Sequence, residues 1–261
     1  MAKPIPLRGR PPQEGAAPLV CVPLVGADAA AICAEAEAMA TAARTPGAAA
    51  PDLLEWRVDA LDAAGDPSAV EAAAHALRAS AGPLPLLVTL RAAREGGRDH
   101  GLDDAARAAR LASIVETGAA DLVDLEADAA PEALRTLRDA CRRQGVPLVL
   151  SAHHFERTPP VAQMVASFRR AADLGADIAK LAVMPKTPGD VDALMAATAA
   201  ADAALAIPLV SMSMGETGVP SRVAGFRHGS RITWASAGAA SAPGQLPLAE
   251  LRRRLRAELG R

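Results

Sequence analysis

The chain of 261 residues has few of the side chains that recognise nucleic acids. Tyrosine is absent and only three phenylalanines and two tryptophans occur, so platforms for stacking bases are scarce. The formal net charge is −2, which lacks the basic excess that attracts a polyanion. The composition therefore argues against nucleic acid as a partner.

Cysteine is also scarce. The three cysteines, Cys21, Cys33 and Cys141, are odd in number, lie far apart and form no Cys-x-x-Cys pair. This pattern argues against a disulfide framework and against a structural zinc site. We expect no metal and no cofactor that depends on cysteine ligands.

Long apolar runs are missing as well. The longest alanine-rich stretch, residues 195–210, is interrupted by Asp202 and Pro208 and is too short and too polar to span a membrane. The first residues carry basic side chains and several prolines, and no apolar segment follows them directly. We therefore expect a flexible tail at residues 1–17, no signal peptide, no membrane partner and a cytoplasmic location.

Short apolar runs alternate with longer helical patterns, and this alternation predicts the fold. Eight runs read as buried strands: Leu19–Pro23, Leu53–Val58, Leu86–Leu90, Leu122–Leu125, Leu148–Ser151, Ile178–Val183, Leu209–Met212 and Ile232–Ala235. Seven stretches have helical patterns: Asp28–Ala43, Pro67–Ala79, Asp104–Glu116, Pro131–Gln144, Pro160–Leu174, Pro188–Ala204 and Leu248–Leu259. Asp28 is expected to cap the first helix, and glycines such as Gly145 are expected to end helices.

Eight strands separated by helices favour an α/β fold of the (β/α)8 barrel (TIM barrel) type, with a doubly wound open sheet as the second choice. Neither Gly-x-Gly-x-x-Gly after a strand nor a Walker motif is present, which argues against nucleotide binding. We find no linker that would divide the chain, so we expect one domain over residues 18–261.

One lysine stands out within the sixth predicted strand. Lys180 lies in the apolar run that ends at Pro185. An ammonium ion is costly to bury, and burial favours the neutral amine that a Schiff-base nucleophile needs. A lysine paired with a carboxylate, or one that reaches the surface, is the structural alternative.

Polar residues gather at the carboxyl ends of the predicted strands, where the chemistry of a barrel is located. Glu55 and Arg57 share one face of their strand, whereas His153 and His154 face opposite sides and make a poor metal pair. The remaining candidates at strand ends and following loops are Arg91, Glu95, Lys180, Arg222, Ser241 and Gln245. Several cations at one end of a barrel predict an anionic, hydroxylated small molecule as ligand.

Seven motifs resemble those of type I 3-dehydroquinate dehydratase, in the order of that family, over about Val20 to Gln245. They are Glu55-Trp56-Arg57-Val58-Asp59, Arg94-Glu95-Gly96-Gly97, Ser151-x-His153-x-Phe155, Ala179-Lys180-Leu181-Ala182-Val183-Met184-Pro185, Ser211-Met212-Ser213-Met214-Gly215, Ser221-Arg222-x-Ala224-Gly225 and Ala240-Ser241-Ala242-Pro243-Gly244-Gln245. The resemblance implies a (β/α)8 barrel that forms a homodimer and uses no metal or cofactor. It implies a lyase of the shikimate pathway, and so of aromatic amino-acid biosynthesis, that dehydrates 3-dehydroquinate to 3-dehydroshikimate.

The resemblance also implies a role for each candidate residue. Lys180 forms an imine with the substrate ketone, His153 removes and returns the proton, and Glu95 orients and tunes His153. The implied substrate-binding residues are Glu55, Arg57, Arg91, Arg222, Ser241 and Gln245, with Arg222 and Gln245 at the carboxylate and Ser241 in a loop that closes over the ligand.

Three positions depart from the pattern that the family leads us to expect: Pro23 replaces a serine, His154 an aspartate and Trp234 a phenylalanine. Two other functions would account for some of these residues. A class I aldolase on a barrel would need Lys180 without the carboxylate-binding pair, and a barrel that only binds a ligand would need no nucleophile.

Overall fold

The computed structural model describes residues 3–11, 17–238 and 242–260. Its contacts divide the chain into two compact units. The first unit comprises Met1–Pro6, Pro11–Val22 and Val149–Arg261, and the second unit comprises Leu7–Arg10 and Pro23–Leu148.

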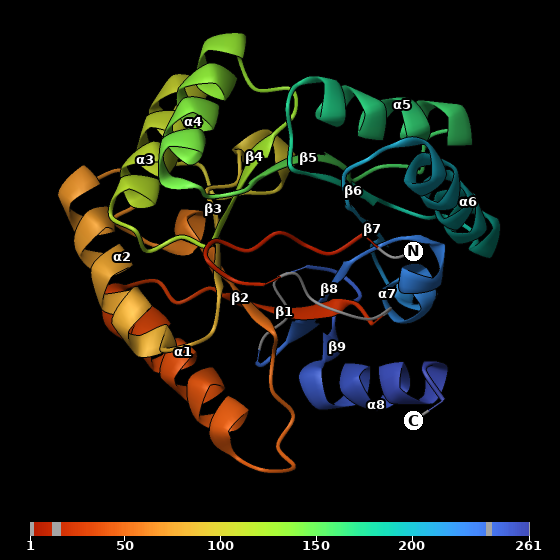
Figure 1. The fold of residues 1–261 in the computed structure, drawn as a ribbon, viewed down its shortest axis with the longest axis horizontal. Helices are drawn as coiled ribbons and strands as arrows, with labels where there is room; N and C mark the ends of the chain where they lie inside the picture. The colour runs from red at the N-terminus through yellow and green to blue at the C-terminus, as the bar shows by residue number, and fades with distance from the viewer. Residues whose placement is uncertain (1–2, 12–16, 239–241, 261) are drawn as a thin grey trace. The chain divides into compact units, whose positions relative to one another are not determined.

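The second unit alternates strands and helices. It contains α1 (Ala29–Arg44), β2 (Leu53–Arg57), η1 (Val58–Ala60), α2 (Pro67–Ala81), β3 (Leu86–Thr89), η2 (Ala93–Glu95), α3 (Asp104–Glu116), β4 (Leu122–Glu126) and α4 (Pro131–Gln144). The strands pair in parallel in the order β2–β3–β4. Helices α1 and α2 pack side by side, as do α3 and α4 (Figure 1).

The first unit holds the remaining elements. They are most of β1 (Leu19–Leu24) and β5 (Leu148–His154), then α5 (Val161–Asp173), β6 (Ile178–Val183), α6 (Pro188–Ala204), β7 (Leu209–Ser213), α7 (Val219–Ala224), η3 (Gly225–His228), β8 (Ile232–Ser236), β9 (Leu246–Pro247) and α8 (Leu248–Glu258). Strands β5, β6 and β7 pair in parallel in chain order.

The first strand of the chain pairs with the last strand of the predicted set. Residues Leu19, Val20 and Cys21 of β1 lie opposite Ile232, Thr233 and Trp234 of β8, in parallel. Closure of a barrel requires this pairing, whereas an open doubly wound sheet has no such pairing of first with last strand. Together with the alternation of strands and helices, it confirms the predicted (β/α)8 class over the doubly wound alternative.

Local sequence explains where the helices begin and end. The side chains of Asp28, Asp66 and Asp103 accept hydrogen bonds from backbone N–H groups in the first turns of α1, α2 and α3. At α4 the chain leaves the helix through Gly145, whose φ of 64° is left-handed and suits glycine. The predicted cap at Asp28 and the predicted helix end at Gly145 are both confirmed.

Apolar burial holds the strands in place. Nearly every strand residue is buried, and Trp56 and Phe168 are among the largest side chains with almost no exposed surface.

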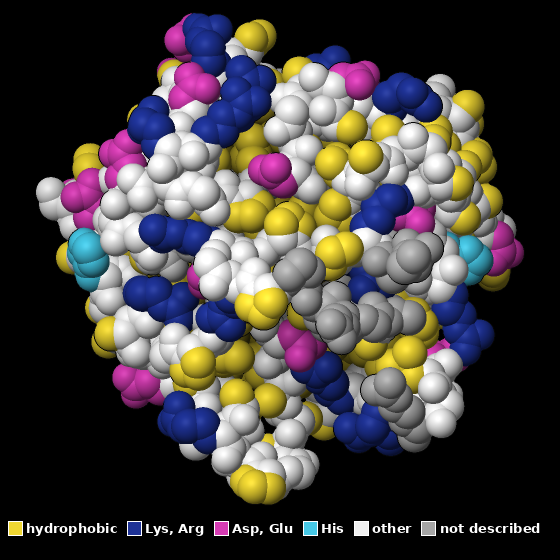
Figure 2. All heavy atoms as spheres, in the orientation of Figure 1, with side chains coloured by type: hydrophobic (Ala, Val, Ile, Leu, Met, Phe, Trp, Pro, Cys, Tyr) yellow, Lys and Arg dark blue, Asp and Glu magenta, His cyan; other side chains and the backbone are white. Residues whose placement is uncertain are grey.

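On the face drawn in Figure 2, basic and acidic side chains are interspersed rather than gathered by sign. None of the helices in the described part of the chain is both long and apolar enough to cross a membrane.

The segment predicted as a tail makes contacts where the structure describes it. In the first unit, Lys3 forms an ion pair of 2.7 Å with Asp202, and Ile5 is only 1% exposed. In the second unit, the Arg8 guanidinium donates to the Gly118 carbonyl over 3.1 Å. Residues 3–8 therefore take part in packing.

We predict that Ile5→Ala lowers the free energy of unfolding by about 2–5 kcal/mol, because a buried aliphatic side chain is removed and a cavity is left. Urea unfolding followed by circular dichroism measures this. The exposed neighbour Pro4 supplies the control, since Pro4→Ala removes little buried surface. Equal stability of the two variants would contradict the packing of this segment.

Candidate active site

Lys180 and His153 share one face of two neighbouring strands in the first unit. In the parallel register of β5 and β6, Ser151 lies opposite Lys180 and His153 lies opposite Ala182. Because side chains alternate along a strand, His153, Ser151 and Lys180 project from the same side. Lys180 is 6% exposed and His153 is half-buried, so the lysine sits deeper than the histidine.

The Lys180 amine lies against an aromatic face. Its Nζ is 4.6 Å from the ring centroid of Trp234, a buried residue of β8. A tryptophan ring at this distance favours a cation over its face. The position where phenylalanine was expected thus carries a larger ring that touches the predicted nucleophile.

His154 faces away from the lysine. It lies opposite Val183 in the register, and strand alternation puts it on the other side from His153. Burial, and next the charge of Arg157, lower the pKa of His154 below its ordinary value. Within the described residues no group of three His, Cys, Asp or Glu could hold a metal ion, and the expectation of a metal-free reaction stays a prediction.

Arg222 is a buried cation without a carboxylate partner among the described residues. It lies on α7 and is 2% exposed. Its Nη2 donates to the Pro243 carbonyl over 3.0 Å, its Nη1 lies 3.8 Å from the Met212 sulfur, and its Nε has no hydrogen-bond partner within residues 3–11, 17–238 and 242–260. Burial lowers the pKa of Arg222 to about 10. Such a guanidinium is suited to receive an anion.

A second contact of the Pro243 carbonyl fixes the loop that holds Arg222. The same oxygen accepts the Gly215 N–H over 3.1 Å. The next residue, Gly244, has a φ of 76° and approaches so closely that a Cβ there would lie 2.1 Å from the Gly215 carbonyl oxygen. Gln245 follows Gly244 and is half-buried. Arg222 donates to Pro243, so the two predicted carboxylate-binding residues Arg222 and Gln245 both belong to the structure around the Pro243–Gly244 turn. Ser241 lies outside the described residues.

In the second unit, Glu55 and Arg57 occupy the end of β2. Glu55 accepts a hydrogen bond of 2.8 Å from the Thr89 hydroxyl. Arg57 donates through Nε and Nη2 to Asp59 over 2.9 and 2.6 Å. Burial alone would raise the pKa of Asp59, but the hydrogen bond and charge of Arg57 hold it below its ordinary value.

Arg91 is fully engaged with two buried acids. Its Nη2 pairs with Asp124 and its Nη1 with Glu126, each over 2.8 Å. The backbone N–H of Arg91 donates to Asp59 over 3.2 Å. The positive charge of Arg91 is therefore neutralised by Asp124 and Glu126, whereas that of Arg222 is not neutralised by a described carboxylate.

Asp59, Asp124 and Glu126 are buried carboxylates at the strand ends that were not among the predicted site residues. A signal was present, because Asp124 and Glu126 alternate at the end of an otherwise apolar strand and so share a face. Buried carboxylates on one face call for cationic partners. Their partners Arg91 and Arg107 come from the loop after β3 and from α3, and sequence spacing alone does not pair them.

Glu95 is a carboxyl group that keeps its proton near neutral pH. It ends the short helix η2 and is 9% exposed. Burial raises its pKa to about 8, although the charge of Arg91 opposes the shift, and Glu126, Asp128 and Asp124 raise it further. A group that titrates near pH 7 is suited to proton transfer or to tuning a neighbouring base. Glu95 and His153 belong to different units, and the expected pairing of the two stays a prediction.

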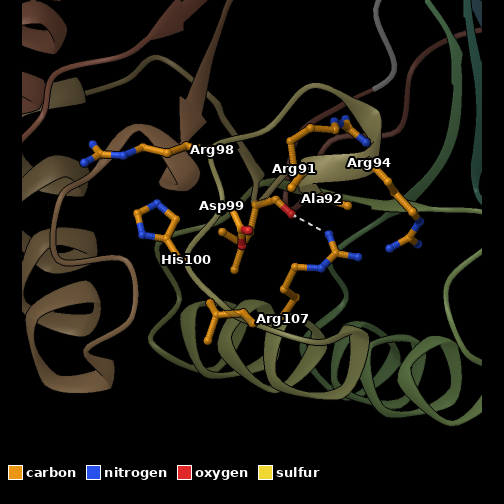
Figure 3. Close-up of a pocket in the computed structure, with 10 residues that line it drawn as sticks. Arg91, Ala92, Arg94, Arg98, Asp99, His100 and Arg107 are labelled. Atoms are coloured by element: carbon orange, nitrogen blue, oxygen red, sulfur yellow. Dashed lines mark hydrogen bonds between the residues drawn. The ribbon is translucent and has the colours of Figure 1, made fainter.

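A pocket in the second unit borders the loop that carries Arg91. Its lining residues are Leu90, Arg91, Ala92, Ala93, Arg94, Arg98, Asp99, His100, Leu102 and Arg107. Figure 3 shows Arg107 reaching from α3 toward the loop, with Arg98 and His100 on one side and Arg94 on the other. Of the predicted site residues, Arg91 lines this pocket.

Comparison with known proteins supports one family. The model of the family described as type I 3-dehydroquinase matches residues 20–259. The 3-dehydroquinate dehydratase of Albidiferax ferrireducens is 42% identical over 250 residues, which cover 96% of this chain and 92% of that protein.

Two solved structures have the same fold. The crystal structure of 3-dehydroquinate dehydratase from Geobacillus kaustophilus superimposes with a TM-score of 0.88 at 41% identity and covers 94% of this chain and 93% of that one. The type I 3-dehydroquinate dehydratase of Clostridium difficile, solved with covalent modified comenic acid, gives a TM-score of 0.90 at 31% identity over 99% and 98% of the two chains.

The raised pKa of Glu95 predicts a pH-dependent stability. The folded state holds this proton up to about pH 8, whereas the unfolded carboxyl releases it near its ordinary pKa of 4.5. The stabilising contribution is therefore complete below about pH 4.5 and is lost as the pH rises through about 8. Glu95→Gln does not titrate at this position. The free energy of unfolding of the variant minus that of the unaltered protein should therefore be larger at high pH than at low pH, by at least about 1 kcal/mol.

Urea unfolding at about pH 5 and about pH 9 measures the difference between variant and unaltered protein. Glu116→Gln is the matched control, because the Glu116 side chain is 52% exposed. Parallel pH dependences for Glu95→Gln and the unaltered protein would contradict the raised pKa.

Proposed function

This chain belongs to the type I 3-dehydroquinase family, and from that premise we propose that it is a lyase that converts 3-dehydroquinate to 3-dehydroshikimate through an imine on Lys180. The observation that carries the proposal is the placement of Lys180 and His153 on one face of β5 and β6. A nucleophilic amine beside a proton carrier is the set that imine-based proton abstraction needs.

The proposed reaction begins with attack of the Lys180 amine on the substrate ketone. Loss of water gives a protonated imine, which withdraws electrons and makes the adjacent C2–H bond acidic. His153 takes the C2 proton, and the electron pair moves toward the imine nitrogen. The pair then returns to expel the C1 hydroxyl, which leaves as water with the proton from His153. Hydrolysis of the imine releases the product and restores the amine.

The surroundings of Lys180 support a cationic intermediate. The Trp234 ring, 4.6 Å from Nζ, favours a positive charge on that nitrogen. Arg222, buried and without a carboxylate partner in the described part of the chain, offers its charge to the substrate carboxylate. Trp234 would thus stabilise the charge of an imine on Lys180, and Arg222 would bind the anionic end of the substrate.

The remaining roles are proposed on the resemblance. Gln245 binds the carboxylate end together with Arg222, and Ser241 belongs to the loop over the ligand. Glu55, Arg57 and Arg91 bind the ring hydroxyls, and Glu95 tunes proton transfer by His153. The charge balance of Arg57 and Arg91 supports this division, since neutral ion pairs suit hydroxyl groups.

We further propose that residues 18–261 form one catalytic domain, that two copies associate as a homodimer and that the protein works in the cytoplasm. The family match over residues 20–259 supports the first of these, and the family resemblance supports the other two.

We predict that the chain converts 3-dehydroquinate to 3-dehydroshikimate. The reaction is measured by the ultraviolet absorbance of the conjugated enone in the product. Lys180→Ala should lower kcat by on the order of a thousandfold or more, because the covalent route is lost. Lys186→Ala, at an exposed lysine before α6, is the matched control and should keep full activity. Full activity in Lys180→Ala would overturn the proposal.

The two adjacent histidines provide a second comparison. His153→Ala should lower kcat by about 10²- to 10⁴-fold, the usual contribution of a positioned acid–base group. His154→Ala should change kcat little, because His154 faces the other side of β5. A larger loss of kcat in His154→Ala than in His153→Ala would contradict the assignment of proton transfer to His153.

A further inference from the structure

Glu126 and Arg107 form a buried ion pair that none of the roles above uses. Glu126 ends β4 and has no exposed surface, and Arg107 on α3 is 3% exposed. The Oε2 atom of Glu126 accepts from Nη1 of Arg107 over 2.7 Å. Burying two charges costs free energy that a well-packed apolar pair would avoid, so stability alone is a weak reason for this pair.

The pair contacts the backbone on both sides of Arg91. Oε1 of Glu126 accepts from the N–H of Ala92 over 3.0 Å. Nη1 of Arg107 donates to the carbonyl of Leu90 over 3.0 Å, the bond drawn as a dashed line in Figure 3. The carbonyl before Arg91 and the N–H after it are therefore joined through one carboxylate and one guanidinium.

Glu126 also holds the Arg91 side chain directly. Its Oε1 accepts from Nη1 of Arg91 over 2.8 Å, while Asp124 accepts from Nη2. One carboxylate thus receives donors from the side chain of Arg91, the backbone of Ala92 and the side chain of Arg107. Since Asp124 already offers a negative charge to Arg91, the additional effect of Glu126 is to fix where residues 90–92 run.

We infer that Glu126 and Arg107 are positioning residues that fix the backbone and side chain of Arg91 for substrate binding. The inference rests on the proposed function, in which Arg91 binds a ring hydroxyl. Residues 90–92 follow the end of β3 and belong to no helix or strand. The Ala92 carbonyl accepts backbone N–H groups, whereas the Leu90 carbonyl and the N–H groups of Arg91 and Ala92 bond to side chains. A preorganised binding group loses less conformational entropy when the ligand arrives.

The test compares kcat and KM for 3-dehydroquinate. Glu126→Gln replaces two acceptor oxygens with one acceptor and one donor, so at least one of the three donors loses its partner. We expect KM to rise about tenfold, while kcat changes much less, because binding that is equal in ground and transition states is lost. Glu116→Gln is the matched control, an identical change at an exposed ion pair between α3 and α4, and should leave KM unchanged.

A second pair of variants covers poor folding of Glu126→Gln. Arg107→Met removes every donor, whereas Arg107→Lys keeps the charge and a donor, so KM should rise more in Arg107→Met than in Arg107→Lys. Thermal unfolding is measured in parallel. Variants that melt earlier but keep the KM of the unaltered protein would show a purely structural role and overturn the inference. Absence of turnover by the unaltered chain would contradict the proposed function itself, and the inference with it.

Discussion

Charge buried at the carboxyl ends of the strands is the constraint on which the site depends. In the second unit it is met by pairing, since Arg91 lies between Asp124 and Glu126, and Arg57 lies against Asp59. A buried ion whose partner is removed costs several kcal/mol. The strand ends can therefore carry several buried charged groups only because each of them is paired with a group of opposite charge. The pairs have little net charge, which suits a ligand that is rich in hydroxyl groups.

In the first unit, the buried cation Arg222 is balanced differently. Arg222 has carbonyl and sulfur neighbours in place of a described carboxylate, and burial lowers its pKa to about 10. An incoming carboxylate would supply the missing negative charge and raise the pKa of Arg222 again. Local structure maintains this arrangement, since the Pro243 carbonyl binds both Arg222 and the Gly215 N–H. Under the proposed function, the balanced Arg57 and Arg91 bind hydroxyl groups of the substrate and the unbalanced Arg222 binds its carboxylate.

Sequence patterns predict most of this fold because short apolar runs between turn residues are local signals. All eight predicted strands begin at the residue where the structure begins them, from Leu19 to Ile232. The short elements α7 and β9 were missed, since six and two residues carry no usable periodicity. The position of Lys180 within an apolar strand, and of His153 and Arg222 at or after strand ends, made them candidate site residues from the sequence. Asp59 was missed although its partner Arg57 lies two residues before it. Asp124, Glu126 and Arg107 were not predicted, because their partners are distant in the sequence and only the fold brings them together.

The imine on Lys180 is the central claim, and chemical trapping tests it most directly. The protein is treated with sodium borohydride during turnover of 3-dehydroquinate, and the modified peptide is located by mass spectrometry. A reduced ligand bound to Lys180, absent when substrate is omitted, is the predicted result, because reduction converts the imine to a stable amine. Product formation without any adduct on Lys180, or an adduct on Lys186 instead, would contradict the account.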